Sequence, residues 1–461
     1  IRRGGYDHIS NKTIIVNLAL ILCYMAGIFI SFNAKRNKER ALSVIFSIFL
    51  LINVLDLTAN AYHTYGFQAL KCESALEYSE TIRDNYKEFS YVQGNDRYFY
   101  RMENLVPRQQ NDALQYDFNG ITHYSSAGLV YARYFLQRLG FNDDNLYTSY
   151  GHDNTETADS LLGIKYLIGD GSVSVHHNYQ LFHEGTKNTY YNPYTLGLAV
   201  GTRDFDLEGI SDPGDVRPDP AMTHVPALDP FSLQEDMYSR ITGKDQHIFV
   251  DAEVSSGDIS EADGKFKKIF EVTAAMDGEM YMYLGGLIGA GEGLSIYRGE
   301  EFLTSYGNLS CTKVLNLGYL SKGESLEITV QAESENDDFG EAFFVTEDVS
   351  ALEKAYGDAE DRNCLVTRMS SSSLKIETKD CDGVFLTIPY QDGWNIKVDG
   401  KKTDAVSVYD CFIYVPVDSG KSAHTVEMSF IPKGIVLGCI ITILGIICLV
   451  IVCVLDRRRQ I

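Results

Sequence analysis

The sequence lacks the short motifs that mark most metal and nucleotide sites. Its nine cysteines form no Cys-x-x-Cys pair, and no His-x-x-x-His cluster accompanies them, so we expect no zinc site. No Gly-rich phosphate loop, nucleophile elbow or metal-binding loop is present either, which gives no support for nucleotide use inside the cell. We therefore expect neither a metal nor a cofactor.

Basic residues are scarce in the long middle part of the chain. Ten of the 40 Lys and Arg residues, but only four of the 63 Asp and Glu residues, lie outside residues 61–433. The middle part thus holds 30 basic and 59 acidic residues, a formal net charge of −29. Such a surface argues against nucleic acid as a partner, and it repels phosphate-rich polymers at long range.

Long apolar runs occur only near the two ends of the sequence. Residues 13–32, 41–61 and 434–455 each approach the roughly 20 residues that a helix needs to cross a bilayer. Three transmembrane helices are the simplest prediction. The alternative, that these runs are core helices, fits poorly because each run is longer than usual for a core helix and borders a charge cluster.

Two basic clusters predict the orientation in the membrane. Residues 34–40 join the first two runs, and Arg457–Arg459 follow the third. Short loops rich in Lys and Arg stay in the cytoplasm. We therefore expect two transmembrane helices with a cytoplasmic turn in residues 1–61, an outer part in residues 62–433, and a last helix with a cytoplasmic tail in residues 434–461.

The chain opens with Ile1-Arg2-Arg3 and shows neither an initiator Met nor a signal peptide. Two helices joined by a tight basic turn are typical of the last members of a multi-helix bundle. We interpret the chain as the later part of a longer protein. Processing after a cleaved leader is the alternative.

The outer part contains five cysteines, and an odd number cannot pair completely within one chain. Cys381 could form a disulfide with Cys364 or with Cys411. Free buried thiols fit the sequence equally well.

Alternating helical and strand patterns characterise the first section of the outer part. Helices are predicted over residues 73–89 and 126–139, and strands over residues 97–102 and 161–168. Such alternation indicates an extracytoplasmic α/β or α+β module over residues 62–206.

Short β-rich runs follow a stretch of Pro, Gly and Asp that breaks regular structure. We predict a linker over residues 207–245, a β-sandwich over residues 246–350 and a membrane-proximal β-sandwich over residues 351–433, as one or two sandwich modules. Asp399-Gly400 is the strongest hairpin signal in the chain. The predicted fold class is therefore a membrane protein of mixed α and β structure, with three helices of a larger bundle.

Several stretches, in their order and spacing, carry a resemblance to a known family. They are Asn111–Leu114, Asn119–Ser126, Leu161–Tyr166, Asp229–Gln234, Pro389–Gly400 and the pattern of residues 420–432 ahead of the last helix. Together they resemble the C-terminal half of YfhO-type bacterial membrane proteins. The resemblance covers most of residues 50–455.

The resemblance implies a polytopic glycosyltransferase of the GT-C architecture in the bacterial cell membrane. Such an enzyme transfers a sugar from a polyprenyl-phosphate donor to a surface polymer such as teichoic acid, so its implied partners are the lipid bilayer, the lipid-linked sugar and the acceptor polymer. The reaction needs a carboxylate base and groups that bind phosphate. In GT-C enzymes the base usually lies in the first outer loop, which we expect upstream, so no catalytic residue is named here.

Polar residues in two places are candidates for substrate binding. Asp56 and Asn60 lie four residues apart near the outer end of the second helix, and so on one helix face. Asp56 could equally mark the helix exit or pair within the bundle. The second group is Arg101, Asn111, Asn119, His123, Ser125 and Ser126. The alternative for this group is a set of turn and cap residues, with Ser125 or Ser126 as the N-cap of the helix that follows.

Trp394, the single tryptophan, could stack on a sugar ring, although an anchor in the sandwich core is the stronger interpretation. Two functions remain open. The first is the glycosyltransferase, in which case we expect this chain alone to be inactive. The second is a non-catalytic, membrane-anchored domain that binds carbohydrate or acts as a scaffold, which the lack of an evident catalytic group favours.

Overall fold

The structure is a computed structural model of the whole chain. It describes residues 21–22, 24–26, 28–29, 38–69, 74–96, 98–126, 128–143, 147–151, 153–211, 219, 221–262, 264–285, 293–306, 313–334 and 339–459. The predicted helix of residues 13–32 lies mostly outside these ranges, and so does most of the breaker-rich stretch of residues 211–220. The chain divides into two units, residues 1–84 and 85–461, which are described separately.

The first unit contains α2 (Lys38–Ala69) and the start of α3 (Ala75–Asn95). The predicted second membrane helix, residues 41–61, lies within α2. Several of its described apolar side chains, such as Phe46 and Leu57, are more than half exposed. The apolar stretch Phe46–Thr58 is shorter than a membrane span.

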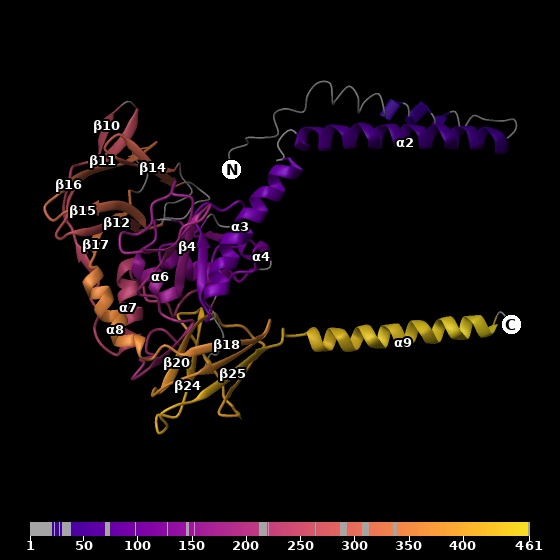
Figure 1. Cartoon of the computed structure of the whole chain (residues 1–461). Helices are drawn as coiled ribbons and strands as arrows, with labels where there is room; N and C mark the ends of the chain where they lie inside the picture. The colour runs from indigo at the N-terminus through magenta and orange to yellow at the C-terminus, as the bar shows by residue number, and fades with distance from the viewer. Residues whose placement is uncertain are drawn as a thin grey trace. The chain divides into compact units, whose positions relative to one another are not determined.

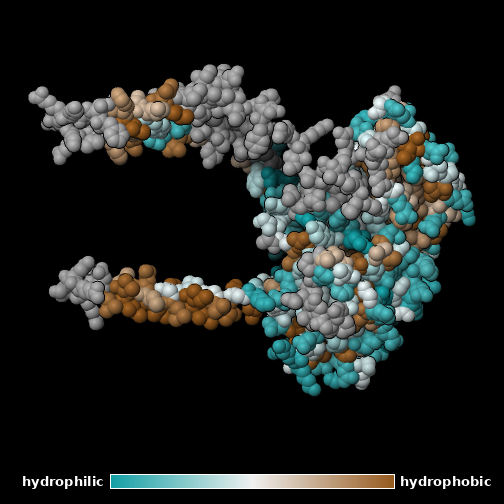
Figure 2. Space-filling view, turned by 180° about the vertical axis from the view of Figure 1, so that it is seen from behind, coloured by the Kyte–Doolittle hydropathy of each residue, from teal (hydrophilic) through white to brown (hydrophobic). Residues whose placement is uncertain are grey.

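The second unit ends in α9 (Ile435–Arg459), which follows the last strand directly. The 21 residues Ile435–Leu455 have a mean hydropathy of 3.3, and none of that stretch is buried. Figure 2 shows apolar residues over most of the visible face of α9. In the described part of the chain, α9 is the one helix long and apolar enough to cross a membrane. Three such helices therefore remain a prediction.

An α/β module opens the second unit. Its mixed sheet has the strand order β1-β4-β6-β5, in which β1 and β4 are parallel. The strands are β1 (Arg101–Asn104), β4 (Ile164–Gly169), β5 (Gln180–His183) and β6 (Asn188–Tyr191). Helices α4 (Asp112–Gln115), α5 (Val130–Arg138) and α6 (Glu156–Leu162) and the short hairpin β2 (Asn142–Asp143) and β3 (Thr148–Ser149) complete the module.

Three predicted elements of this module begin later than the sequence pattern indicated. The strand predicted over residues 97–102 is β1, which starts at Arg101. Helix α5 starts at Val130 with Leu129 as its N-cap, so the prediction that Ser125 or Ser126 caps it is wrong. Residues 161 and 162 end α6 instead of opening a strand, because Gly163 adopts φ 69° as the left-handed C-cap and β4 starts after it.

Residues 230–242, inside the predicted linker, form α7 (Pro230–Thr242). Asp229 caps this helix by accepting hydrogen bonds from the backbone N–H groups of Phe231 and Ser232, and Pro230 occupies the first turn. The apolar side chains of α7 are buried in the core of the second unit. Composition alone missed this helix because its flanks are rich in Pro and Asp.

The first sandwich has two antiparallel sheets. One sheet contains β10-β11-β16-β13-β14, with β9 also on β11, and the other has the order β15-β12-β17-β8. The strands are β8 (Phe249–Asp251), β9 (Glu253–Ser256), β10 (Ser260–Ala262), β11 (Lys265–Thr273), β12 (Gly278–Gly285), β13 (Leu294–Arg298), β14 (Glu301–Tyr306), β15 (Leu315–Leu320), β16 (Ser325–Ala332) and β17 (Glu341–Glu347). A separate apolar core fills the space between the sheets.

The second sandwich includes a strand from the α/β module. Its sheets are β18-β19-β25-β21-β22 and β23-β24-β20-β7, and β7 lies some 180 residues before its partner β20 in sequence. The elements are β7 (Ala199–Thr202), α8 (Val349–Glu360), β18 (Leu365–Ser370), β19 (Ser373–Glu377), β20 (Gly383–Pro389), β21 (Trp394–Val398), β22 (Lys401–Lys402), β23 (Val406–Val408), β24 (Phe412–Pro416) and β25 (Thr425–Phe430). The predicted Asp399-Gly400 hairpin is confirmed, and both residues have positive φ.

One apolar core joins the α/β module to α7, α8 and the second sandwich. Figure 1 shows the strands of the first sandwich and those of the second sandwich on opposite sides of α6, α7 and α8. Cys364, Cys381 and Cys411 are buried and free, so neither predicted disulfide is formed. These contacts hold the α/β module and the second sandwich together, and the groove described next lies between them.

Candidate functional site

A groove opens between the α/β module and the second sandwich. It consists of two hollows of about 610 and 550 Å³, which share His123, Pro389 and Gln391. We call the first the α5 hollow, because α5 forms one wall, and the second the Trp394 hollow. Together they are the His123 groove. Helix α5 and the loop before it come from the module, whereas Pro389, Gln391 and Trp394 come from the sandwich.

Backbone hydrogen bonds fix the loop that presents His123. The carbonyl of Asn119 accepts from Met102 N at 2.9 Å, and Asn111 Oδ1 accepts from Tyr124 N at 2.9 Å. The loop also forms an isolated bridge between His123 and Thr148. Held in this way, the loop exposes the side chains of His123, Ser125 and Ser126 to the α5 hollow.

Glu103, on β1, supports the same loop from below. Its buried carboxylate accepts hydrogen bonds from the backbone N–H groups of Ile121 and Thr122. Burial raises the pKa of Glu103 to about 7, although the bond from Ile121 N opposes this shift. The loop therefore rests on a group that changes charge near neutral pH.

Arg101 joins three elements at the floor of the Trp394 hollow. Its guanidinium donates to the carbonyls of Leu162, at the end of α6, and of Thr387, on β20, and it reaches Thr387 Oγ1 at 3.0 Å. Burial lowers the pKa of Arg101 to about 10. With its donors engaged in this way, Arg101 ties the module to the sandwich and is not a free phosphate-binding cation.

The Trp394 hollow combines an aromatic ring with polar groups. Trp394 is half-buried against the sandwich core, and its ring lies 5.1 Å from the Phe430 ring. Its Nε1 is buried and has no hydrogen-bond partner among the described residues. Arg368 is exposed on the same wall, next to the serine turn of residues 370–373. The hollow thus offers a ring face, hydroxyls and a cation.

The chain path places this hollow close to the predicted membrane helix. Phe430 lines the hollow and pairs with Trp394 across β25 and β21. Helix α9 begins at Ile435, and five residues of extended chain span at most about 17 Å. Phe430, at the edge of the Trp394 hollow, therefore lies within about 17 Å of the start of α9.

The structure brings six of the nine predicted binding residues to the groove. Arg101, Asn119, His123 and Trp394 line the Trp394 hollow, and His123, Ser125 and Ser126 line the α5 hollow. Asn111 does not line it and instead holds the loop through Tyr124. Asp56 lies half-buried on α2 in the first unit, and the side chain of Asn60 lies outside the described residues.

Apart from Trp394, sequence reasoning missed the residues that the second sandwich contributes to the groove. Gln391 stands within the Pro389–Gly400 stretch that carried the family resemblance, and the run of serines at residues 370–373 is visible in the sequence. Arg368 gave no signal of its own. Among the described lining residues there is no Asp, Glu or Cys, so this lining offers neither a carboxylate base nor a set of metal ligands.

Comparison with protein families gives one match over almost the whole chain. A family model described as bacterial membrane protein YfhO matches residues 4–442. None of the curated proteins that were compared matches the chain.

Some solved structures are similar over part of the chain. They include a β-glucuronidase from Ruminococcus gnavus, with 7% identity over 37% of this chain and 34% of that chain and a TM-score of 0.17. A β-galacturonidase from Eisenbergiella tayi has 10% identity over 40% of this chain and 38% of that chain, also with a TM-score of 0.17. The match thus spans little more than a third of each of these proteins, and TM-scores this low carry no argument.

Proposed function

Because the chain belongs to the YfhO family of bacterial membrane proteins, we propose that it forms part of a membrane glycosyltransferase. In this proposal a sugar passes from a polyprenyl-phosphate donor to a cell-surface polymer such as teichoic acid. The acceptor hydroxyl attacks the anomeric carbon, the bond to the lipid phosphate breaks, and the phosphate leaves with the electron pair. A base outside the described groove lining takes the proton of the hydroxyl.

The position of the Trp394 hollow is the observation that carries the proposal. A lipid-linked sugar has its phosphate at the membrane surface, and Phe430, which lines the hollow, lies within about 17 Å of the start of α9. The exposed Arg368 guanidinium suits a phosphate, and Trp394 suits the face of a sugar ring. The part of the chain between residues 61 and 433 has a net charge of −29, so it does not attract polyanions over long distances. Binding of an anionic substrate therefore depends on local contacts such as those in the Trp394 hollow.

The proposal includes a topology. The basic turn near Lys38 and the C-terminal arginines lie in the cytoplasm, and the sandwiches and the α/β module lie outside the bacterial membrane. Three transmembrane helices satisfy this arrangement, and α9 anchors the second sandwich at the outer surface.

Groove variants in the source bacterium test the proposal. We expect Arg368→Ala in the complete gene to remove most of one sugar substituent from the surface polymers, measured by NMR and mass spectrometry of the purified polymers. Arg368 is exposed, so this change leaves the fold intact. The matched control is Lys397→Ala, an exposed cation of the same sheet that lines neither hollow. The proposal is contradicted if both variants and the gene-deletion strain carry the same sugar substituents as the wild type.

A second function rests on the lining of the groove. Because the described lining has no carboxylate, the groove can bind carbohydrate without catalysing transfer, as a membrane-anchored binding or scaffolding domain. This alternative predicts that deletion of the gene changes the amount or location of the polymer and leaves its sugar substituents intact.

A further inference from the structure

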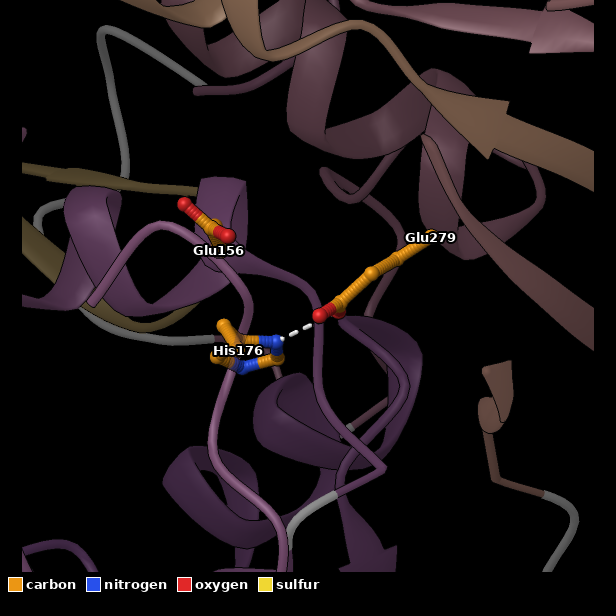
Figure 3. Close-up of side chains that lie close together, drawn as sticks. All are labelled: Glu156, His176 and Glu279. Carbon is orange, nitrogen blue, oxygen red and sulfur yellow. Dashed lines mark hydrogen bonds and ion pairs between the residues drawn. The ribbon is translucent and has the colours of Figure 1, made fainter. Parts of the chain in front are cut away.

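A buried group of ionisable side chains lies where the α/β module meets the first sandwich. Glu156 and Asp159 belong to α6, His176 to the loop between β4 and β5, Glu279 to β12, and Glu347 to the end of β17. All five residues are at most 9% exposed. Figure 3 shows the His176 ring facing the Glu279 carboxylate, with Glu156 close by on α6. We call this set the Glu156 cluster. Its members come from segments that lie far apart in sequence, and none of them lines the His123 groove.

Strand alternation explains how the acidic side chains come to face α6. On β12, Met280 and Met282 belong to the core between the two sheets of the first sandwich. Glu279 and Tyr281 therefore point to the opposite face of the sheet, which the α/β module covers. Glu347 on β17 is buried on that same covered side, where its carboxylate accepts from Thr157 N at 2.7 Å.

The hydrogen bonds of Glu279 determine the state of the His176 ring. Glu279 Oε2 accepts from Tyr281 OH at 2.8 Å and from Asn316 Nδ2 at 3.0 Å, and Oε1 accepts from His177 N at 2.7 Å. An ionised carboxylate only accepts hydrogen bonds, so His176 Nδ1, at 2.9 Å from Oε2, carries a proton. Both oxygens of Glu279 thus accept hydrogen bonds.

Two other carboxylate oxygens in the cluster have no such partners. Glu156 Oε2 and Asp159 Oδ1 are buried and make no hydrogen bond to any described residue. The other oxygen of each carboxylate accepts hydrogen bonds. Glu156 Oε1 accepts from Asn178 Nδ2 at 3.0 Å, and Asp159 Oδ2 accepts from two tyrosine hydroxyls. An unpartnered, buried carboxylate oxygen costs free energy unless a proton or a cation fills the space beside it.

The charge balance of the cluster points to the same need. Four carboxylates face a single imidazole, and burial in a low-dielectric environment disfavours their charged forms. A single imidazole cannot balance the charge of four carboxylates, so the cluster is short of positive charge.

We propose that Glu156, His176 and Glu279 bind one divalent transition-metal ion. Each of the three offers a donor atom, and these atoms lie within 4.8 Å of one another. His176 Nδ1 and Glu279 Oε2 are 2.9 Å apart, close to the separation of about 3.3 Å between two ligands of one ion with bonds near 2.1 Å. The ion replaces the Nδ1 proton, which is released to solvent. Asp159 and Glu347 contribute negative charge beside it.

The donor set indicates which ions fit. One imidazole nitrogen with carboxylate oxygens suits Zn²⁺ or Mn²⁺, whereas Mg²⁺ and Ca²⁺ prefer oxygen ligands alone. The ion joins α6 to β12 and thereby fixes the first sandwich to the α/β module. Its expected role is structural, because binding free energy at such a site becomes folding free energy.

Metal analysis of the full chain, purified in detergent, tests this site. After incubation with Zn²⁺ or Mn²⁺ and desalting, we expect one ion per chain by mass spectrometry, and a lower unfolding temperature after treatment with EDTA. Glu156→Gln should weaken binding at least about tenfold. This variant removes no hydrogen bond of Glu156 Oε2, so folding is preserved. The control is Asp410→Asn. Asp410 lies 2.9 Å from His224, but among the described residues this pair has no third metal-binding side chain beside it, so the variant should bind the ion normally.

Three results overturn the proposal. The first is the absence of a retained ion at micromolar metal. The second is an equal loss of binding in Glu156→Gln and Asp410→Asn. The third is a cobalt-loaded chain whose spectrum shows thiolate ligands, which assigns binding to cysteines. A further result also contradicts metal binding: EDTA leaves the unfolding temperature unchanged, and Glu156→Gln raises the unfolding temperature. In that case the carboxylates of the cluster are neutralised by protonation.

Discussion

At the scale of single residues, Arg101 was predicted to bind a sugar, but its hydrogen bonds show a structural role. The sequence placed it among the sugar-binding candidates, and the structure places it at the groove with its guanidinium bonded to Leu162 and Thr387. Its donors hold the walls of the groove together, while Arg368 presents a cation to the solvent-filled space.

Arg101→Ala should therefore act on stability. The change leaves the carbonyls of Leu162 and Thr387 without donors, and we expect the free energy of unfolding to fall by about 2–4 kcal/mol. Chemical unfolding of the purified chain, followed by circular dichroism, measures this loss. Arg368→Ala is the control and should stay within about 0.5 kcal/mol of the wild type, because Arg368 is exposed. Equal effects of the two changes would show that Arg101 is not a structural tie.

Glu103 gives a prediction about pH. Its pKa in the folded chain is about 7 and its ordinary value is 4.5, so the folded state holds the proton more tightly than the unfolded state. The contribution to stability is thus fully present below about pH 4.5 and is lost as the pH rises to about 7. The loss amounts to about 3 kcal/mol.

Glu103→Gln should remove this pH dependence. Glutamine keeps the oxygen that accepts from Ile121 and Thr122 but does not ionise. The difference in unfolding free energy between variant and wild type, measured from pH 5 to pH 8, should increase in favour of the variant. A difference that is constant with pH would contradict the assigned role of Glu103.

Local sequence signals predicted part of the candidate site and missed the rest for a physical reason. His123, Ser125 and Ser126 share one short loop, so their clustering was visible in the sequence. Trp394 joins them because β7 of the module pairs with β20 of the second sandwich and Arg101 bonds to Thr387 of β20. Such long-range pairing leaves no trace in local composition. The same holds for His176 and Glu279, which lie 103 residues apart in sequence.

At the scale of elements, α7 is the clearest addition to the sequence analysis. Its N-cap signal was present, because Asp229 precedes Pro230, but the surrounding breakers favoured a linker. By contrast, the Asp399-Gly400 hairpin was predicted correctly, since two residues with positive φ are enough to define that turn. Local chemistry thus identified turns more reliably than helices buried in a shared core.

Loss of the α7 cap should be measurable. Asp229→Ala removes the acceptor for two backbone N–H groups and for the Ser232 hydroxyl, and we expect the unfolding free energy to fall by about 1 kcal/mol. Asp251→Ala, an exposed aspartate on β8, is the control and should change it by less than about 0.5 kcal/mol. If both variants unfold like the wild type, Asp229 does not stabilise α7.

At the scale of the whole molecule, the orientation in the membrane connects the groove to its proposed substrate. The sandwiches and the module must face outward for the groove to meet a lipid-linked sugar and a surface polymer. One helix, α9, has the length and hydropathy of a span in the described part of the chain, and the remaining topology is a prediction from the basic clusters.

Epitope tags test this topology. A tag inserted at the open turn of Gly323 should bind antibody on intact protoplasts, whereas a tag after Ile461 should bind only after permeabilisation. Both tags should be detected equally after detergent treatment, which controls for expression. If antibody binds the C-terminal tag on intact protoplasts, the predicted orientation is wrong and the groove does not lie at the outer surface.

The most direct test of the account is sugar transfer by the complete protein in nanodiscs. The donor is a radiolabelled polyprenyl-lipid extract from the source bacterium, and the acceptor is surface polymer from the deletion strain. We predict that label passes to the polymer with the wild type and with Lys397→Ala, and that Arg368→Ala transfers at least about tenfold less, the loss of one phosphate contact. Absence of transfer by the wild type, with the sugar substituents unchanged in the deletion strain, would contradict the glycosyltransferase function and favour the scaffold.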